Sequence, residues 1–247
     1  MFIAANWKMN LDKTSIKKFC DNLKNFEFND NIRVTIFPPT IYINYLSDLL
    51  IKTPVSIGGQ NCHFMPSGAF TGDISAISLK EFGCEFVIVG HSERRNYYNE
   101  TNSYIKSCAE AAIKNDITPI ICVGESLNDR ENNKALNFIE RQINECLPDY
   151  FERIIIAYEP IWSIGTGKIP SSNQIKEMHS FIKKIISLKS KKNVKVLYGG
   201  SVNSLNINEI LLIENVDGIL VGGASLKIKE FLAIYNSAVK QLTLSSQ

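Results

Sequence analysis

The chain has 247 residues, of which 45% are hydrophobic and 21% charged, and its formal net charge is +2. These proportions are typical of a folded globular protein and exclude an intrinsically disordered chain. So small a basic excess gives no reason to expect nucleic-acid or membrane binding as the main function, and the length suits either two small domains or one large α/β barrel.

The first residues, Met1–Lys8, lack the charged start and the apolar run of a secretory signal peptide. No apolar stretch approaches the roughly 18 residues that a membrane span needs, so we expect a cytoplasmic protein. With three histidines and no C-x-x-C pair, a zinc site is not expected. Most of the six cysteines are predicted to be small buried side chains; they are Cys20, Cys62, Cys84, Cys108, Cys122 and Cys146.

Short runs of β-forming residues recur along the chain. They are Phe2–Asn6, Arg33–Phe37, Val55–Gln60, Phe86–Gly90, Ile117–Val123, Arg153–Glu159, Val194–Gly199 and Gly218–Gly222. Several are almost continuously apolar, as in Phe86–Val89 and Ile154–Ala157. Such runs are typical of strands that are buried on both faces of a parallel sheet.

Between the strands lie stretches whose apolar residues recur at helical spacing. The clearest is Ser171–Ser187, which begins with capping residues and places Ile175, Met178 and Ile182 on one face. Weaker helical patterns cover Thr101–Asn115, Asn132–Cys146, Ser204–Ile213 and Ser225–Ala238.

Eight strands that alternate with helices predict an α/β fold, a single (β/α)8 TIM barrel in which eight parallel strands are surrounded by helices. No linker-like segment divides the chain, so residues 1–247 are predicted to form one domain. An open, doubly wound sheet is the structural alternative. The chain has neither a G-x-G-x-x-G nor a G-x-x-x-x-G-K-[ST] motif, and we expect no cofactor.

Barrel enzymes carry their chemistry at the C-terminal ends of the strands, where the following loops converge. In this chain those positions hold Asn6-Trp7-Lys8, Gln60-Asn61, Gly90-His91-Ser92-Glu93, Tyr158-Glu159-Pro160, Gly199-Gly200-Ser201 and Gly222-Gly223. An acid, an imidazole, a lysine and two glycine-rich turns are therefore predicted around one mouth of the barrel.

The two glycine-rich turns follow the predicted seventh and eighth strands, where barrels often bind phosphate. Glycine lets the backbone approach an anion closely, and the free N–H groups at the start of a helix attract negative charge. Tight turns also use glycine, so one pair alone is weak evidence. Two pairs at these two strands favour a phosphate site.

Three side chains are the main catalytic candidates. Glu159 follows an apolar strand, where a carboxylate is costly unless it reaches the mouth or forms a structural ion pair. His91 also closes an apolar strand, whereas His179 lies in an amphipathic helix and His63 in a loop rich in proline and glycine. Lys8 is either a catalytic cation or a solvated surface lysine.

The segment Pro160–Lys168 directly follows Glu159 and mixes apolar residues with glycines. This composition favours a lid, which needs a hinge at each end and an apolar tip that excludes water. The alternative is an ordinary loop between a strand and a helix.

Taken together, these segments resemble the triosephosphate isomerase family, in the family's order and from the first strand to the last helix. The matching segments are Asn6–Asn10, Gly90–Arg95, Ala157–Gly167, Tyr198–Val202 and Leu220–Leu226. The stretch around Glu159 is highly specific. The resemblance implies an isomerase of glycolysis and gluconeogenesis that interconverts dihydroxyacetone phosphate and D-glyceraldehyde 3-phosphate through an enediolate, without a metal or other cofactor.

By this likeness Glu159 would move a proton between neighbouring carbons, and a neutral His91 would polarise the carbonyl, an arrangement of which this family is a standard example. A helix that starts just after His91, at Ser92, would disfavour the charged imidazole. Asn6 and Lys8 would hold the substrate oxygens. Glu93 would pair with Lys8 and is a further candidate for proton transfer.

The same likeness assigns the phosphate to backbone N–H groups of Gly165, Ser201, Gly222 and Gly223, with the lid closing over it. Ile164 and Leu220 would then press on Glu159, and drying the carboxylate would strengthen it as a base. Closure would also keep the enediolate from losing its phosphate, which in water gives methylglyoxal.

The loop from Gln60 to Asp73 is unusually long, and its apolar residues, among them Phe64 and Phe70, are hard to explain on an exposed loop. In the family this loop reaches into a second subunit, so the resemblance implies a homodimer. Thr71 would then lie near the partner's Asn6 and the partner's His91. Cys62 would lie beside the interface, and a bulky thiol reagent on it is expected to dissociate the dimer.

Three departures from the family's pattern stand out: Asp73 replaces a usual Glu, Asn99 a common Gly, and Ala4-Ala5 a common Gly pair. None touches the expected chemistry, although Asp73 could alter the interface. A catalytically silent barrel that binds phosphates or partner proteins is the alternative function, but it would need no base. A different phosphosugar isomerase is a second alternative, and the segment around Glu159 argues against it.

Overall fold

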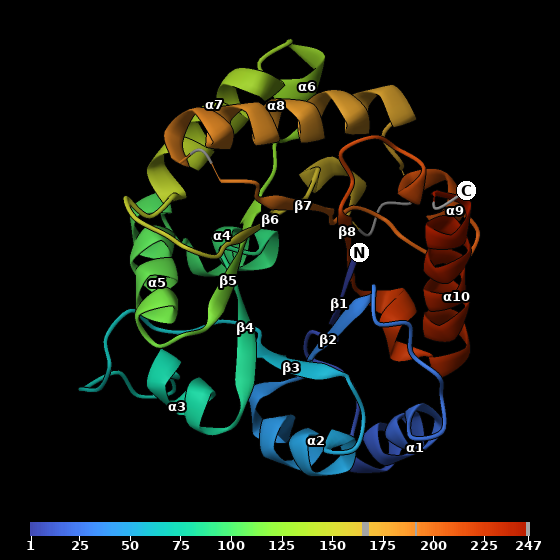
Figure 1. Ribbon diagram of the computed structural model, residues 1–247. Coiled ribbons are helices and arrows are strands. Elements are labelled where there is room, and N and C mark those ends of the chain that lie inside the picture. The colour runs from blue at the N-terminus through green and yellow to red at the C-terminus, as the bar shows by residue number, and fades with distance from the viewer. Residues whose placement is uncertain (165–167, 191, 246–247) are drawn as a thin grey trace.

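A computed structural model describes residues 1–164, 168–190 and 192–245 (Figure 1). In this part of the chain eight parallel strands pair in chain order, and β8 pairs with β1, which closes the barrel. The strands are β1 (Phe2–Asn6), β2 (Arg33–Phe37), β3 (Ser56–Gly59), β4 (Cys84–Val89), β5 (Thr118–Val123), β6 (Ile155–Tyr158), β7 (Lys195–Tyr198) and β8 (Gly218–Val221). The predicted barrel is confirmed and the open sheet is wrong.

Helices form a ring around the strands in Figure 1. They are α1 (Lys13–Leu23), α2 (Ile43–Leu50), α3 (Ala76–Glu81), α4 (Ser92–Tyr98), α5 (Asn102–Lys114), α6 (Leu127–Glu131), α7 (Ala135–Cys146), α8 (Ser172–Ser190), α9 (Ile207–Leu211) and α10 (Ile228–Ser245). Short 3-10 helices lie at η1 (Thr40–Tyr42), η2 (Ile161–Ser163) and η3 (Gly223–Leu226). Within the described residues, none of the helices has the length and apolar character needed to cross a membrane.

The strands separate two hydrophobic cores, because successive side chains of a strand point to opposite faces. In β1, Phe2 and Ala4 pack inside the barrel, whereas Ile3 and Ala5 pack outside it against the helices. The other strands divide their residues in the same way, with Ile120 and Cys122 of β5 inside the barrel. Burial on both faces explains why the strands read as continuous apolar runs.

Side-chain caps determine where several helices begin. Asp12 accepts a hydrogen bond from the backbone N–H of Ser15 at the start of α1, and Thr101 accepts one from Tyr104 at the start of α5. Ser126 and Asp129 form a reciprocal capping box at α6. Each such cap contributes roughly 1 kcal/mol to helix stability.

Several predicted boundaries are wrong. The strands β3, β6 and β7 are shorter at both ends than predicted, and α8 extends to Ser190. The helix predicted from Asn132 begins only at Ala135, because Asn133 takes a left-handed backbone with φ 56°. The patterns predicted from Ser204 and Ser225 likewise start late, at Ile207 and Ile228. The helices α1, α2, α3 and α6 have no predicted counterpart.

Asn99, which stands where glycine is common in the family that the sequence resembles, ends α4. Its backbone is left-handed with φ 55°, and its N–H donates to the carbonyl of Arg94. Asparagine tolerates this conformation better than other residues with a side chain. The departure at Asn99 therefore preserves the turn that a glycine would make.

All six cysteines are buried and unpaired, as most of them are predicted to be. Burial raises the pKa of every one of these thiols, for example to about 12 for Cys20 and Cys84. They are therefore protonated, weakly nucleophilic side chains in the folded protein.

Candidate active site

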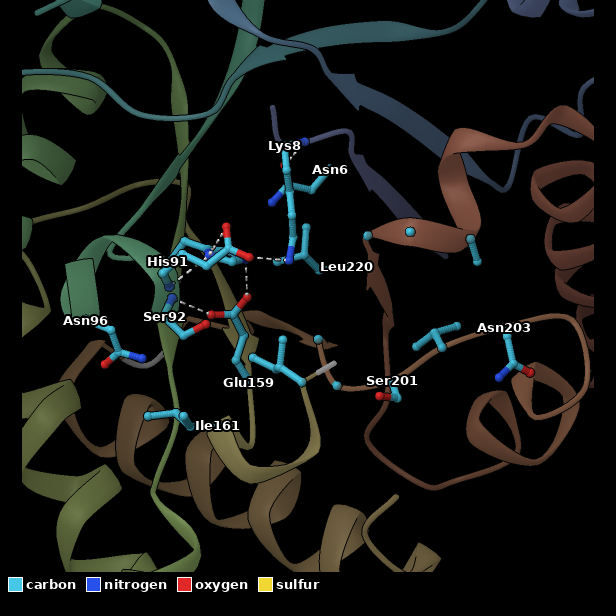
Figure 2. Close-up of a pocket in the computed structure, with 18 of the residues that line it drawn as sticks. Asn6, Lys8, His91, Ser92, Asn96, Glu159, Ile161, Ser201, Asn203 and Leu220 are labelled. Carbon is cyan, nitrogen blue, oxygen red and sulfur yellow. Dashed lines mark hydrogen bonds and ion pairs between the residues drawn. The ribbon is translucent and has the colours of Figure 1, made fainter. Parts of the chain in front are cut away.

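A cavity of about 570 Å³ opens where β1, β4, β6, β7 and β8 end (Figure 2). Its lining includes the predicted site residues Asn6, Lys8, His91, Glu93, Glu159, Ser201, Gly222 and Gly223. Ile164 and Leu220, the two residues expected to press on the acid, also line it. The predicted phosphate-binding residue Gly165 lies outside the described residues, as does the middle of the predicted lid.

Glu159 lies directly after β6 and is only 2% exposed. Its Oε2 accepts a hydrogen bond from the backbone N–H of Ser92 at 3.0 Å, and its Oε1 lies 3.1 Å from Nε2 of His91 (Figure 2). Among the described residues, no lysine or arginine forms a salt bridge with this carboxylate. A permanent structural ion pair, the alternative for Glu159, is therefore not what holds it at the mouth.

His91 is the N-cap residue of α4, which confirms the predicted helix start. Its Nδ1 accepts a hydrogen bond from the backbone N–H of Glu93 at 3.2 Å. An accepting Nδ1 carries no proton, so we assign a ring proton to Nε2, the nitrogen that faces Glu159.

Lys8 lies at the mouth with an unusual backbone, φ 51°. Asn6 Oδ1 accepts a hydrogen bond from its N–H at 3.0 Å, and Gln60 Nε2 donates to its carbonyl at 2.8 Å. A second bond of 2.9 Å ties the Gln60 amide to the carbonyl of Phe37. These bonds offset a backbone strain that costs on the order of 1 kcal/mol or more.

The side chain of Lys8 crosses the mouth to Glu93, where Nζ lies 2.5 Å from Oε1. A Cβ added to Gly222 would lie 3.4 Å from Cε of Lys8, so the amine also lies close to the turn after β8. The predicted pairing of Lys8 with Glu93 is present. One cation therefore lies between the acidic side of the cavity and the predicted phosphate turn.

The turn after β8 has room for an anion. A Cβ added to Gly223, the first residue of η3, would meet no atom within 4 Å. On the turn after β7, the hydroxyl of Ser201 donates to the carbonyl of Ser163 at 2.6 Å. Its backbone N–H has only a long contact of 3.4 Å to Ser163 Oγ, which leaves it available for a better acceptor.

Two glycines outside the predicted set shape the position of Glu159. A Cβ added to Gly124, which follows β5, would lie 1.7 Å from the backbone carbonyl oxygen of Glu159. A Cβ added to Gly199 would lie 2.9 Å from Cγ of Glu159. The sequence predictions miss the role of Gly124, which stands just after a predicted strand, and they place Gln60 at a strand end without assigning it a role.

The first half of the predicted lid is anchored to the buried residue Glu125. Trp162 Nε1 donates to Oε1 of Glu125 at 3.1 Å, and the N–H of Ile161 donates to the Glu125 carbonyl at 3.1 Å. Arg130 pairs with the same carboxylate at 2.8 Å. Ser163 donates to the carbonyl of Lys168 at 2.7 Å, which joins the two ends of the segment.

Cys122 packs inside the barrel beneath the acid. Burial, and after it the charge of Glu159, raise the pKa of this thiol well above its usual 9.0. The side chain is therefore a neutral neighbour of Glu159 rather than a competing base.

Comparisons with known proteins agree with this geometry. Residues 1–238 match the family described as triosephosphate isomerase. The chain is 39% identical to the triosephosphate isomerase of Francisella tularensis subsp. mediasiatica (strain FSC147), over 98% of each chain. It is 42% identical to that of Rhizobium etli, over 95% of this chain and 94% of the relative. The crystal structure of triosephosphate isomerase from Bartonella henselae is similar with a TM-score of 0.86 and 38% identity, covering 96% of this chain and 98% of that one.

Proposed function

The chain belongs to the triosephosphate isomerase family, and we propose that Glu159 is the base with which it carries out that family's reaction. The protein is an isomerase that interconverts dihydroxyacetone phosphate and D-glyceraldehyde 3-phosphate, a reaction of glycolysis. The observation that supports the role of Glu159 is its place. This buried carboxylate faces the cavity, accepts a hydrogen bond from Ser92, contacts His91 and has no salt bridge with a lysine or arginine among the described residues.

In this proposal the substrate carbon takes the place of the Ser92 N–H as the partner of the carboxylate. Glu159 removes a proton from the carbon next to the carbonyl, which leaves the negative charge of the enediolate on oxygen. Returning the proton to the neighbouring carbon gives the isomer, and the carboxylate is restored. Because the hydrogen bond from Ser92 holds the carboxylate on the wall, the acid has to leave this position to reach the substrate.

The developing oxyanion would be stabilised by groups that already face the cavity. Nε2–H of His91 is free to donate to a substrate oxygen once Glu159 has moved away, and it can shuttle protons between the two oxygens. Nζ of Lys8 adds a positive charge, and Asn6 fixes the backbone from which that lysine extends. Glu93 neutralises part of the lysine charge.

We place the phosphate group at the turns after β7 and β8. The support is the open space at Gly223, the weakly engaged N–H of Ser201 and the closeness of the Lys8 side chain to Gly222. Backbone N–H groups bind phosphate well when they converge without side chains in the way. The resemblance adds Gly165, and the proposal for that residue rests on its sequence motif alone.

We also propose a homodimer, formed through the loop from Gln60 to Asp73. In Figure 1 this loop projects away from the barrel beside α3. The ring of His63 packs against Phe64 and Phe70, with centroids 4.4 and 4.1 Å away, so the loop has its own small core. Both phenylalanines nevertheless remain more than a third exposed, and Met9 is 93% exposed. Such apolar exposure favours a protein interface.

Two broader proposals complete this description. Residues 1–247 act as one domain, because β1 and β8 from opposite ends of the chain pair with each other. The protein acts in the cytoplasm, where glycolytic enzymes find their substrates.

The experiment that tests the proposed base is isomerisation of glyceraldehyde 3-phosphate in buffer with a metal chelator. We expect fast turnover by the native chain and a loss of about 100-fold or more in kcat for Glu159→Asp, because withdrawing the carboxylate by about one bond misplaces the base. Glu131→Asp, an exposed carboxylate on α6, is the matched control and keeps native activity. A native rate in Glu159→Asp would eliminate Glu159 as a positioned base.

A further inference from the structure

A second cavity lies at the other mouth of the barrel, where the strands begin. It encloses about 690 Å³, which is larger than the cavity that holds Glu159. We call it the basal groove, and define it by the cationic side chains on its lining, Arg33, Lys80, Arg153, Lys192 and Lys195. Pockets of several hundred Å³ are of the size that binds metabolites and cofactors.

The basal groove has an excess of positive charge that the protein does not neutralise. Its lining holds those five cations but three carboxylates, Glu85, Asp116 and Glu152. Arg33 pairs with Glu85. Within the described part of the chain, the other four cations form no salt bridge.

The four remaining cations differ in how they are held. Lys80 and Lys192 donate to the backbone carbonyls of Asp116 and Phe151, each at 3.0 Å, which positions the amines and leaves their charge uncompensated. Arg153 lies just before β6, and Lys195 is the first residue of β7. These two strands are neighbours in the barrel. Neither side chain has a hydrogen-bond partner among the described residues. Both side chains are exposed, so their positive charges are available to an anion from solvent.

The positive charge of Lys195 also acts on the N-terminal amino group of Met1. The pKa of the Met1 amino group lies below its usual value, first because the group is partly buried and second because of the charge of Lys195, while Asp217 opposes the effect. The positive potential therefore extends from β7 to β1 across the mouth of the barrel.

The floor of the basal groove is apolar. Phe2 and Phe86 meet edge to face there with ring centroids 5.0 Å apart, and Ile155 forms the adjoining wall. Phe86 is partly exposed, whereas Phe2 and Ile155 are almost fully buried. A site with cations on its rim and an apolar floor fits a ligand that carries several negative charges and an uncharged part.

We propose that the basal groove is a second binding site, which takes a small molecule with two or more linked phosphate groups. Arginine and lysine are the side chains that bind phosphate oxygens most strongly, and Arg153 can contribute two parallel N–H bonds to one phosphate. Linked phosphates match the spread of the cations over β6, β7 and the segments before them. The phosphates contact Arg153 and Lys195, and any ring or other apolar part lies over Phe86.

This site is separate from the proposed active site. The strands carry the two sites at their opposite ends, with Arg153 just before β6 and Glu159 just after it. A ligand in the basal groove touches none of the residues that line the catalytic cavity. Triose phosphate in the active site therefore does not displace it.

The test is calorimetric titration with inorganic pyrophosphate at low salt, in the presence of saturating triose phosphate, which occupies the active site. We expect one pyrophosphate per chain and binding at least tenfold weaker in the double variant Arg153→Ala/Lys195→Ala. The control Lys18→Ala/Lys184→Ala removes the same charge from two exposed lysines that form no salt bridge with any described residue, and it should bind within twofold of the native chain. Both double variants keep the native kcat and unfolding temperature.

The second arm repeats the titration with adenosine diphosphate and with Phe86→Ala. Tighter binding of the nucleotide than of pyrophosphate, lost in Phe86→Ala, supports a ligand with a ring on the floor. Equal binding of the two supports a ligand recognised by its phosphates alone. The proposal is overturned if pyrophosphate does not bind at millimolar concentration, if triose phosphate displaces it, or if both double variants weaken it equally. Should Arg153→Ala/Lys195→Ala unfold early, Lys195→Glu alone is used, because that side chain is exposed.

Discussion

Nε2 of His91 lies 3.1 Å from Oε1 of Glu159, so the proposed base and the proposed electrophile contact each other. The contact restricts the orientations of both side chains. It also shields the buried carboxylate, whose other oxygen accepts a hydrogen bond from the N–H of Ser92. The substrate has to insert between the two groups. Glu159 and His91 then each contact a substrate atom instead of each other.

His91→Gln should lower kcat by 10²–10⁴-fold, the range that a general acid or base contributes, with KM changed only a few-fold. The glutamine amide can still donate a hydrogen bond toward Glu159, but it cannot pass protons between oxygens. Steady-state kinetics measure the effect. His179→Gln, which alters a histidine outside the cavity, should keep the native kcat; equal losses in both variants would contradict a special role for His91.

Gln60→Ala should lower kcat by on the order of tenfold, less than the hundredfold that a displacement of about 1 Å at a catalytic group costs. The amide of Gln60 holds the strained backbone of Lys8, and its loss lets that residue relax away from the mouth. A matched exposed amide, Asn22→Ala on α1, serves as the control. If Gln60→Ala and Asn22→Ala show the same kinetics, the backbone of Lys8 does not need this support.

Gly124→Ala should reduce kcat by about 100-fold or more without removing any group that touches substrate. The new methyl would lie 1.7 Å from the carbonyl oxygen of Glu159, so the end of β6 has to shift and carry the carboxylate with it. Kinetics and thermal unfolding are measured together. A folded variant with native kcat would show that the site accommodates the shift.

The protein should lose stability as the pH falls from about 6.5 toward 4, because of His179. Burial lowers the pKa of this histidine from 6.5 to about 4, while its bond with the Asn215 carbonyl partly opposes the shift. The unfolded chain therefore takes up a proton between these values and the folded chain does not. Stability from the neutral ring is present above pH 6.5 and lost as the pH falls through this window.

Between pH 7 and pH 5 this proton uptake amounts to about 2 kcal/mol of unfolding free energy. Urea unfolding of the native chain at the two pH values measures the loss. The same comparison in His179→Gln should show a pH-dependent loss that is smaller by about this amount. An unchanged pH dependence in the variant would contradict the assignment to His179.

Phe70→Asp should convert the proposed dimer to a monomer with reduced activity, because a charge on the projecting loop opposes burial in an interface. Size-exclusion chromatography with light scattering measures the assembly. Leu188→Asp, which places the same charge on an exposed apolar position of α8, is the control. A native chain that elutes as a monomer at micromolar concentration would rule out the dimer.

Chemical labelling of Cys62 is a second test of the proposed dimer. Its thiol is 1% exposed and lies 3.6 Å from the carbonyl of Cys108, so a bulky reagent has to open the loop to reach it. We expect slow labelling, followed by dissociation and loss of activity. Full activity after verified labelling of Cys62 would contradict this prediction.

The sequence was sufficient to place the site because parallel strands of a barrel all end at one mouth. Asn6, His91 and Glu159 each follow an apolar run. Closing the sheet into a barrel brings the ends of these runs together, irrespective of the conformations of the loops. A strand boundary predicted wrongly by a residue or two still leaves such a side chain at the mouth. The prediction of the site therefore tolerated errors in element boundaries.

The features that the sequence did not reveal depend on contacts between distant segments. The left-handed backbone of Lys8 rests partly on Gln60, more than fifty residues away, and the crowding of Gly124 against Glu159 depends on the register of β5 with β6. Neither appears in a local pattern. The first helix, α1, was not predicted, although its buried residues Ile16, Phe19, Cys20 and Leu23 recur at helical spacing.

The burial of the six thiols also affects how the protein is inactivated by heat. While the chain is folded they are inaccessible and protonated, so oxidants have little to react with. Once the chain unfolds, all six cysteines are exposed to solvent. They can then form disulfide bonds, none of which the native protein contains, faster than the barrel refolds. The rate of heat inactivation in air should then be set by the rate of unfolding rather than by the equilibrium between folded and unfolded chains. A reductant should make thermal unfolding reversible again.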